Sequence, residues 1–183
     1  MAVNCAGLGG LAPLTETALA DWDLVVGTCL TGLFLSVKHE ARAMLAGGRP
    51  GTIVNIASIN ATVPAEGMVA YCSAKAGVEM LTRVAAMELG PADIRVVGIG
   101  PGLIDTPLTA YQREQPAFRS AYLEEIPLGR VGTTGDVAAA AVFLASEEAA
   151  WVTGTTLWVD GGERTRGYPR MLGLLEQVLR EQG

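Results

Sequence analysis

The sequence has little of what metal sites, disulfide frameworks and nucleic-acid surfaces are made from. It contains one histidine, His39, and three cysteines, Cys5, Cys29 and Cys72, whose spacing is not that of a zinc site or a disulfide framework. We therefore expect no metal and a reducing, cytoplasmic environment. With 13 Lys and Arg against 19 Asp and Glu, the chain lacks the clustered cations with which nucleic-acid-binding proteins neutralise phosphates.

Long apolar runs are also missing. The longest, residues 137–145, is well short of the roughly 20 residues that cross a bilayer. The N-terminus has no basic stretch leading into an apolar one, as an export signal would have. We expect no membrane partner. What the sequence does have is 50% hydrophobic residues over 183 positions, which is enough to build the core of one domain.

Buried strands alternate with helices along the chain. Apolar residues at helical spacing predict one kinked helix or two consecutive ones over 15–46, with Gly27 and Gly32 at the kink, and further helices over 68–89 and 137–145. Runs of β-branched and apolar residues predict strands at 52–56, 94–99 and 155–159. This alternation predicts an α/β fold, a Rossmann-like doubly wound parallel sheet with helices on both faces.

The pattern begins abruptly. Residues 1–7 resemble the end of a strand that enters a glycine loop, and no Gly-x-x-x-Gly-x-Gly phosphate-binding loop follows an opening strand. We therefore expect only the C-terminal part of the fold, with the first strands and the phosphate-binding loop missing. The strand near residue 3 would then be an exposed sheet edge. Either the protein is longer at its N-terminus, which we favour, or a partner covers that edge.

Three side chains are candidates for chemistry. Tyr71 and Lys75 lie four residues apart on one face of a predicted helix, where an ammonium near a phenol would lower the pKa of the phenol. Ser58 follows a buried strand, at the end of the sheet where such folds bind ligands. Each also has a plain structural interpretation, because such Tyr/Lys pairs are common on helix surfaces and serines often end strands.

Four segments, in order, carry a resemblance to a known family. They are Ile-Val-Asn-Ile-Ala-Ser at 53–58, Tyr-x-x-x-Lys at 71–75, Pro-Gly-Leu-Ile-Asp-Thr-Pro at 101–107 and Trp-Val-Asp-Gly-Gly at 158–162. Together they resemble the short-chain dehydrogenase/reductase family, and Ile126–Val131 resembles its 3-oxoacyl-carrier-protein reductase-like members. The resemblance makes 1–162 a partial NAD(P)-binding Rossmann domain. Residues 163–183 are left as a C-terminal helical extension, whose amphipathic pattern we interpret as a packing or oligomer contact.

The resemblance implies an oxidoreductase that transfers a hydride between NAD or NADP and a carbonyl or secondary alcohol. Tyr71 would donate or accept the proton, Lys75 would lower the pKa of Tyr71 and bind the nicotinamide ribose, and Ser58 would orient the substrate oxygen. The implied cofactor contacts are Asn4, Gly7, Tyr71, Lys75, Pro101, Gly102, Ile104 and Thr106. The two long helices resemble those through which family members form homodimers and homotetramers.

One residue departs from the family pattern. Cys29 stands where the family keeps an asparagine that supports a water relay to the lysine, and a thiol is the weaker hydrogen-bond partner. The alternative hypothesis is therefore a non-catalytic, truncated homologue that acts as an interaction or oligomerisation subunit. Cofactor binding separates the two hypotheses.

Overall fold

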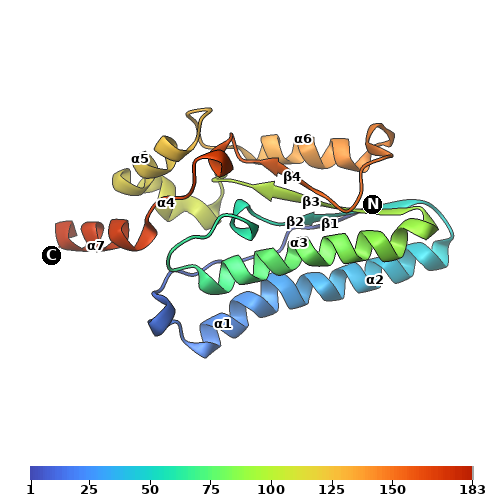
Figure 1. The fold of residues 1–183 in the computed structure, drawn as a ribbon, viewed down its shortest axis with the longest axis horizontal. Helices are drawn as coiled ribbons and strands as arrows, with labels where there is room; N and C mark the ends of the chain where they lie inside the picture. The colour runs from blue at the N-terminus through green and yellow to red at the C-terminus, as the bar shows by residue number, and fades with distance from the viewer. Residues whose placement is uncertain (183) are drawn as a thin grey trace.

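A computed structural model describes residues 1–182 of the chain, and they contain one parallel sheet (Figure 1). Its strands are β1 (Ala2–Asn4), β2 (Gly51–Ile56), β3 (Ile94–Pro101) and β4 (Thr156–Val159). They lie in the order β1-β2-β3-β4, and each neighbouring pair is parallel. The predicted parallel α/β sheet is confirmed.

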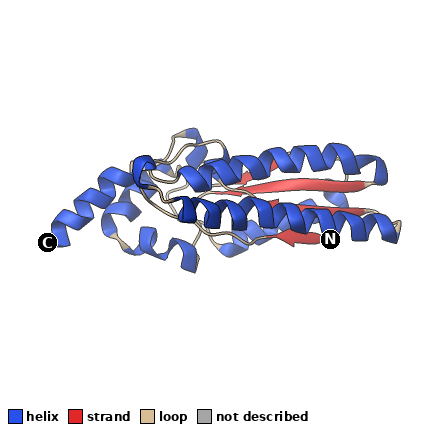
Figure 2. Cartoon of the chain, turned by 90° about the horizontal axis from the view of Figure 1, so that it is seen from below, coloured by secondary structure: helices blue, strands red, loops and turns tan. Residues whose placement is uncertain are grey.

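Helices cover both faces of this sheet. On one face, α1 (Leu19–Val26), a π-helical turn η2 (Gly27–Thr31) and α2 (Gly32–Gly47) form a continuous helix beside α3 (Val69–Leu89). Figure 2 shows these two long helices side by side over the strands. The other face carries α6 (Thr134–Ala145) (Figure 1). The kink expected at Gly27 and Gly32 is the π-helical turn, a feature that is frequent at functional sites.

The shorter elements lie mainly in the connections. They are η1 (Leu14–Glu16), η3 (Ile59–Ala61), η4 (Gly90–Ala92), η5 (Pro107–Thr109), α4 (Ala110–Glu114), α5 (Pro116–Glu125), η6 (Glu147–Ala149), η7 (Glu163–Thr165) and α7 (Met171–Gln182). The expected excursion at 103–132 therefore contains short helices, and the C-terminal extension is helical from Met171. In Figure 1, α4, α5 and α7 gather at one end of the sheet.

The long helix Leu19–Gly47 is apolar enough, by length and composition alone, to cross a membrane. Some of its apolar residues nevertheless have a packing role, because a stripe along one side is buried. This stripe consists of Val25, Cys29, Leu33, Val37 and Ala41. Charged residues interrupt the rest of the helix at Lys38, Glu40 and Arg42, a pattern that is costly inside a bilayer and ordinary for a helix packed on a sheet.

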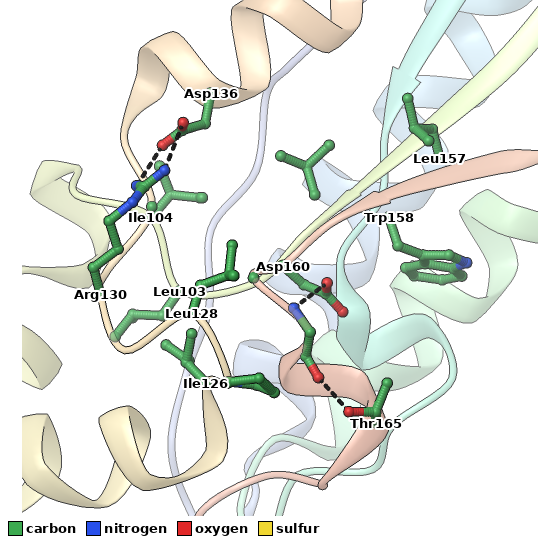
Figure 3. A pocket seen from close by; sticks show the side chains of 15 residues that line it. Leu103, Ile104, Ile126, Leu128, Arg130, Asp136, Leu157, Trp158, Asp160 and Thr165 are labelled. Carbon is green, nitrogen blue, oxygen red and sulfur yellow. Dashed lines mark hydrogen bonds and ion pairs between the residues drawn. The ribbon is translucent and has the colours of Figure 1, made fainter.

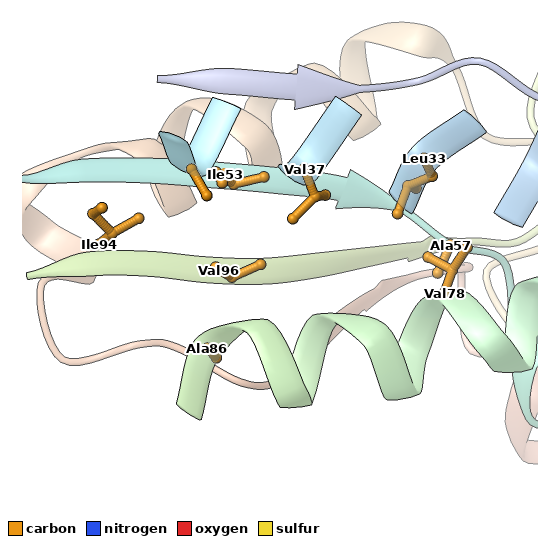
Figure 4. Packing of buried hydrophobic residues seen from close by; sticks show 9 residues of the cluster. Leu33, Val37, Ile53, Ala57, Val78, Ala86, Ile94 and Val96 are labelled. Carbon is orange, nitrogen blue, oxygen red and sulfur yellow. The ribbon is translucent and has the colours of Figure 1, made fainter. Parts of the chain in front are cut away.

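The main core lies between the long helices and the sheet (Figure 4). Val37 of α2 and Val78 of α3 pack toward Ile53 of β2 and Val96 of β3, and all four are buried. Most residues of β2 and β3 are buried on both faces of the sheet, which explains why these strands are continuous apolar runs rather than alternating ones.

β1 is the exposed edge that the sequence predicts. Its Val3 is 43% exposed, so this strand is not buried like its neighbours. Polar side chains hold it in place: the Asn4 amide donates to Asn55 Oδ1 and to Glu40 Oε2, each at 3.0 Å. Asn55 in turn donates to Thr82 on α3 at 3.0 Å.

Candidate active site

Ser58, Tyr71 and Lys75 meet at the carboxyl end of β2. Ser58 caps η3, where its hydroxyl accepts from the Asn60 amide N–H at 3.2 Å and donates to Asn60 Oδ1 at 3.3 Å. Tyr71 and Lys75 lie in the first turns of α3. Lys75 is buried, and its ammonium donates to the carbonyl oxygen of Ile56 at 2.8 Å. The end of β2 and the segment that follows it therefore orient both the serine and the lysine.

Two cavities meet at Ser58 and Tyr71. The first, which we call the Lys75 cavity, has a volume of about 560 Å³ and extends from Lys75 toward β1 and α6. Its lining includes Gly7, Ser58, Tyr71, Lys75, Pro101, Gly102, Ile104 and Thr106. These are the catalytic and cofactor residues expected from the sequence, apart from Asn4. The side chain of Asn4 instead binds Glu40 and Asn55, so its contribution to a cofactor site stays a prediction.

The second cavity, the Tyr168 cavity, shares Ser58 and Tyr71 with the Lys75 cavity. It has a volume of about 220 Å³ and is lined by Ser58 and Tyr71 together with Tyr122, Tyr168 and Met171. Tyr168 and Met171 belong to the segment that the sequence suggests is only a packing or oligomer contact. That interpretation is incomplete, because the C-terminal segment reaches the candidate catalytic residues.

Burial determines the protonation of Tyr71 and Lys75. Burial raises the pKa of Tyr71 to about 12, the neighbouring Ser58 hydroxyl acts in the opposite direction, and Cys29 adds a smaller increase. Burial also lowers the pKa of Lys75. The sequence predicts that the lysine lowers the pKa of the tyrosine, but here desolvation dominates. The Lys75 ammonium lies 5.6 Å from the Tyr71 ring centroid and bonds to Ile56.

The loop after β3 is held against the loop after β4. Gly102 N–H donates to the Val159 carbonyl at 3.1 Å, and Leu103 N–H donates to Glu163 Oε2 at 3.1 Å. A further bond runs from the Asp105 N–H to the carbonyl oxygen at position 132, at 2.8 Å. These bonds fix the start of the 103–132 excursion, which provides several lining residues of the Lys75 cavity.

Glu163 is a buried carboxyl that sequence reasoning missed. It is fully buried, and its Oε1 has no hydrogen-bond partner among the described residues. Burial raises its pKa from 4.5 to about 7, although the Leu103 N–H acts in the opposite direction. A Cβ added to Gly102 would lie 2.5 Å from Glu163 Oε2, so a larger residue there would displace the carboxyl. The sequence signal that could have identified Glu163 is its position directly after the Asp-Gly-Gly turn.

Cys29 contacts the backbone at the departure from the family pattern. It is fully buried within η2. Its Sγ accepts from the Leu8 N–H at 3.4 Å and donates to the Leu8 carbonyl at 3.2 Å. A Cβ built on Gly7 would lie 3.8 Å from this sulfur and 3.7 Å from Lys75 Nζ. The thiol therefore attaches the glycine loop to the long helix beside the candidate catalytic lysine.

The largest of the three cavities lies away from these residues. It has a volume of about 590 Å³ and opens beside β4, where Ile126, Leu128 and Trp158 line it (Figure 3). Arg130 binds Asp136 in its lining through two hydrogen bonds of 2.8 and 3.0 Å, so the cation is already neutralised. Because the candidate catalytic residues do not line it, size is a poor guide to the chemistry here.

Comparisons with known proteins agree with this geometry. A family model described as enoyl-(acyl carrier protein) reductase matches residues 1–163. The chain is 41% identical over 160 residues to 3beta-hydroxysteroid dehydrogenase 1 of Eggerthella lenta, covering 87% of this chain and 61% of that protein. The chain belongs to the short-chain dehydrogenase/reductase family.

Solved structures of family members share the fold. A short-chain type dehydrogenase/reductase from Mycobacterium ulcerans is 39% identical with a TM-score of 0.91, covering 96% of this chain and 64% of that one. An Agrobacterium tumefaciens protein described as a putative 2-deoxy-D-gluconate 3-dehydrogenase, solved with bound NADP, is 41% identical with a TM-score of 0.88, covering 90% and 67%. The chain thus spans about two thirds of the length of these structures, and 61% of the curated relative.

Several site residues of this short-chain dehydrogenase/reductase were not found by sequence reasoning. Asn60, which orients Ser58, lies two residues beyond the end of the Ile-Val-Asn-Ile-Ala-Ser motif. Tyr122 and Tyr168 come from the excursion and the C-terminal extension, and their hydroxyls bond at 2.6 Å. No periodic or motif signal links these two tyrosines, because only the packing of α5 against the C-terminal segment brings them together.

Proposed function

We propose that the protein is an oxidoreductase that transfers a hydride between NAD or NADP and a carbonyl or secondary alcohol. One observation carries this proposal: two cavities of different size share Ser58 and Tyr71 in their linings. Hydride transfer needs a cofactor and a substrate side by side, with a proton donor at the point of contact. The relatives' names support the reaction class.

The lining of the Lys75 cavity suits the nicotinamide end of such a cofactor. A volume of about 560 Å³ lies within the range of ligand pockets. Lys75 would bind the ribose hydroxyls, and Gly7, where a built Cβ would lie 3.7 Å from Lys75 Nζ, lines the cavity beside it. The segment that includes Pro101, Ile104 and Thr106 would hold the carboxamide. When bound, the nicotinamide supplies or accepts the hydride.

The protein's own residues move the proton. Tyr71 has a pKa of about 12, so its phenol holds a proton at neutral pH and can donate it to a carbonyl oxygen. Ser58 still accepts from the Asn60 backbone N–H, and would turn its hydroxyl hydrogen from Asn60 Oδ1 to that oxygen and hold it against Tyr71. In the reverse direction Tyr71 must first lose its proton, which the buried site opposes. The protonated phenol is therefore the form of Tyr71 that takes part in carbonyl reduction.

The same proposal includes a homodimer or homotetramer in a reducing, cytoplasmic environment. The outward face of α3 carries a stripe of exposed apolar residues, Met80, Val84 and Met87, of which Met87 is 73% exposed. Phe34 on the neighbouring α2 is 48% exposed. Exposed apolar surface of this kind is typical of subunit contacts. The free cysteines support a reducing compartment.

Cofactor binding and ketone reduction test the proposal. Purified protein is titrated with NADH and NADPH, and oxidation of the reduced cofactor is followed with a panel of ketones. We expect oxidation that depends on the ketone and falls in Ser58→Ala, because that variant loses the donor that orients the substrate oxygen. A folded protein that binds neither cofactor at millimolar concentration would favour the non-catalytic subunit instead.

A further inference from the structure

The Tyr168 cavity has a chemical character that limits which substrate it can hold. Among the residues that the structure describes, those that line it include no Lys, Arg, His, Asp or Glu. Its walls are largely apolar, with Leu11, Ile59, Met68, Leu103, Leu108 and Met171. A carboxylate or phosphate moved into such walls would lose its hydration and gain no counter-ion.

The charged groups around the cavity do not offset this cost. Arg113, on the helix that provides Gln112 to the lining, is already bound to Asp105 at 3.0 Å. Lys75 lines the other cavity. Glu163 does not line the cavity, but its Oε2 accepts a hydrogen bond from the backbone N–H of Leu103, which does. Any charge on this carboxyl would repel an anion.

The polar side chains that line the cavity, Ser58, Asn60, Tyr71, Thr109, Gln112, Tyr122 and Tyr168, are hydroxyl and amide groups with no formal charge at neutral pH. The Tyr122 hydroxyl donates to the Tyr168 hydroxyl at 2.6 Å. The Tyr168 hydroxyl in turn donates to the sulfur of Met68, at 3.9 Å, and sulfur is a weak acceptor. The Tyr168 hydrogen is therefore easily redirected to a second, uncharged oxygen of a ligand. Gln112 adds an amide whose Oε1 has no partner among the described residues.

We propose that the Tyr168 cavity selects an uncharged, largely apolar ketone or secondary alcohol and discriminates against substrates with a carboxylate or phosphate near the reacting carbon. This inference rests on the proposed function. The discrimination comes from the C-terminal segment and the 103–132 excursion, because they supply Tyr168, Met171 and Tyr122. The cavity volume of about 220 Å³ is below the roughly 300–1,000 Å³ of pockets that hold drug-sized ligands, so only a small part of a substrate, next to the reacting carbon, would fit inside it.

A matched pair of ketones tests the inference. The neutral one carries a methyl group on a cyclohexanone ring, opposite the carbonyl, and the other carries a carboxylate at the same position. With the purified full chain and NADH or NADPH, we expect kcat/KM for the neutral ketone to be at least about 10-fold higher, because burying an unpaired carboxylate is costly. Equal values, or a preference for the carboxylate, would overturn the inference.

A charge added to the lining supplies a second measurement. In Gln112→Lys we expect the preference for the neutral ketone to shrink at least about 10-fold, since the new ammonium can pair with the carboxylate. Gln177→Lys adds the same charge at an exposed position of α7 and should leave the ratio unchanged. An unchanged ratio in the folded Gln112→Lys protein would count against this cavity as the substrate site.

Binding, measured separately, distinguishes failure of the inference from failure of the proposed function. Saturation-transfer NMR reports whether each ketone binds in the absence of turnover. Binding of the neutral ketone alone, with no reduction by either cofactor, would contradict the proposed function and support the selectivity. Reduction that favours the carboxylate would support the function and contradict the selectivity. Neither binding nor reduction would contradict both.

Discussion

Burial, rather than pairing of opposite charges, controls the titratable residues of this site. Tyr71 is held protonated, with a pKa of about 12, and the buried Lys75 is held by a backbone carbonyl. Burial also raises the pKa of the Glu163 carboxyl. This carboxyl accepts a hydrogen bond from Leu103 and so connects the loops after β3 and β4. Single residues therefore have measurable consequences for both stability and chemistry.

Glu163 should make the stability of the fold depend on pH. The unfolded chain releases this proton near pH 4.5 and the folded chain near 7, so the contribution to stability is full below pH 4.5 and is lost as the pH rises to about 7. Glu163→Gln cannot ionise and keeps an acceptor for Leu103. We measure the free energy of unfolding in urea at about pH 4 and about pH 8. As the pH rises between these values, we expect the stability of the variant to increase by roughly 3 kcal/mol relative to that of the native protein.

The same exchange at the exposed Glu124 is the control for this pH dependence. In Glu124→Gln, the change in the free energy of unfolding between the two pH values should stay close to that of the native protein. Parallel pH curves for the native protein and Glu163→Gln would show that the buried carboxyl is not the group that titrates.

Cys29 should stabilise the glycine loop through its two contacts with Leu8. Cys29→Ala leaves the Leu8 N–H and carbonyl without their partner, which we expect to cost about 1–3 kcal/mol in urea unfolding. Cys29→Ser retains a donor and an acceptor and should lose less. Cys5→Ala, at an exposed position, serves as the control. Equal losses for the alanine and serine variants would mean that packing alone explains the role of Cys29.

At the scale of elements, the sequence predicts the helices and strands that have a periodic apolar pattern, but it does not predict which residues from distant segments lie together in space. The buried strands and long helices follow from apolar runs and helical spacing, and Gly27 and Gly32 predict the irregular turn. The Tyr168 cavity does not follow from any local pattern, because its residues come from separate segments. The orientation of the Asn4 side chain could not be predicted either, because it depends on hydrogen bonds to Glu40 and Asn55, which are distant in the sequence.

The C-terminal segment should affect both stability and substrate binding. Tyr168→Phe removes the acceptor of the buried Tyr122 hydroxyl, which we expect to cost about 1–3 kcal/mol in the free energy of unfolding. Because the same hydroxyl lies in the cavity lining, KM for a ketone with a second oxygen should rise while KM for a simple ketone stays constant. A rise in both KM values by the same factor would indicate a general structural effect instead.

At the scale of the whole molecule, the exposed stripe on α3 should decide the oligomeric state. The double variant Met80→Glu with Met87→Glu places charges of one sign on this apolar face, and we expect it to be monomeric by size-exclusion chromatography with light scattering, because buried unpaired charges oppose association. Leu14→Lys, exposed on η1, is the control and should remain oligomeric. A native protein that is itself monomeric would contradict the proposed assembly.

The central claim is that Tyr71 is the proton donor of a nicotinamide-dependent carbonyl reduction, and one pair of variants tests it directly. Tyr71→Phe removes only a hydroxyl, from a residue that lines both cavities. Tyr111→Phe makes the same change at a tyrosine that is 45% exposed. We predict that Tyr71→Phe lowers kcat by about 10²–10⁴-fold while Tyr111→Phe leaves it unchanged. Equal rates for the two variants would contradict the account.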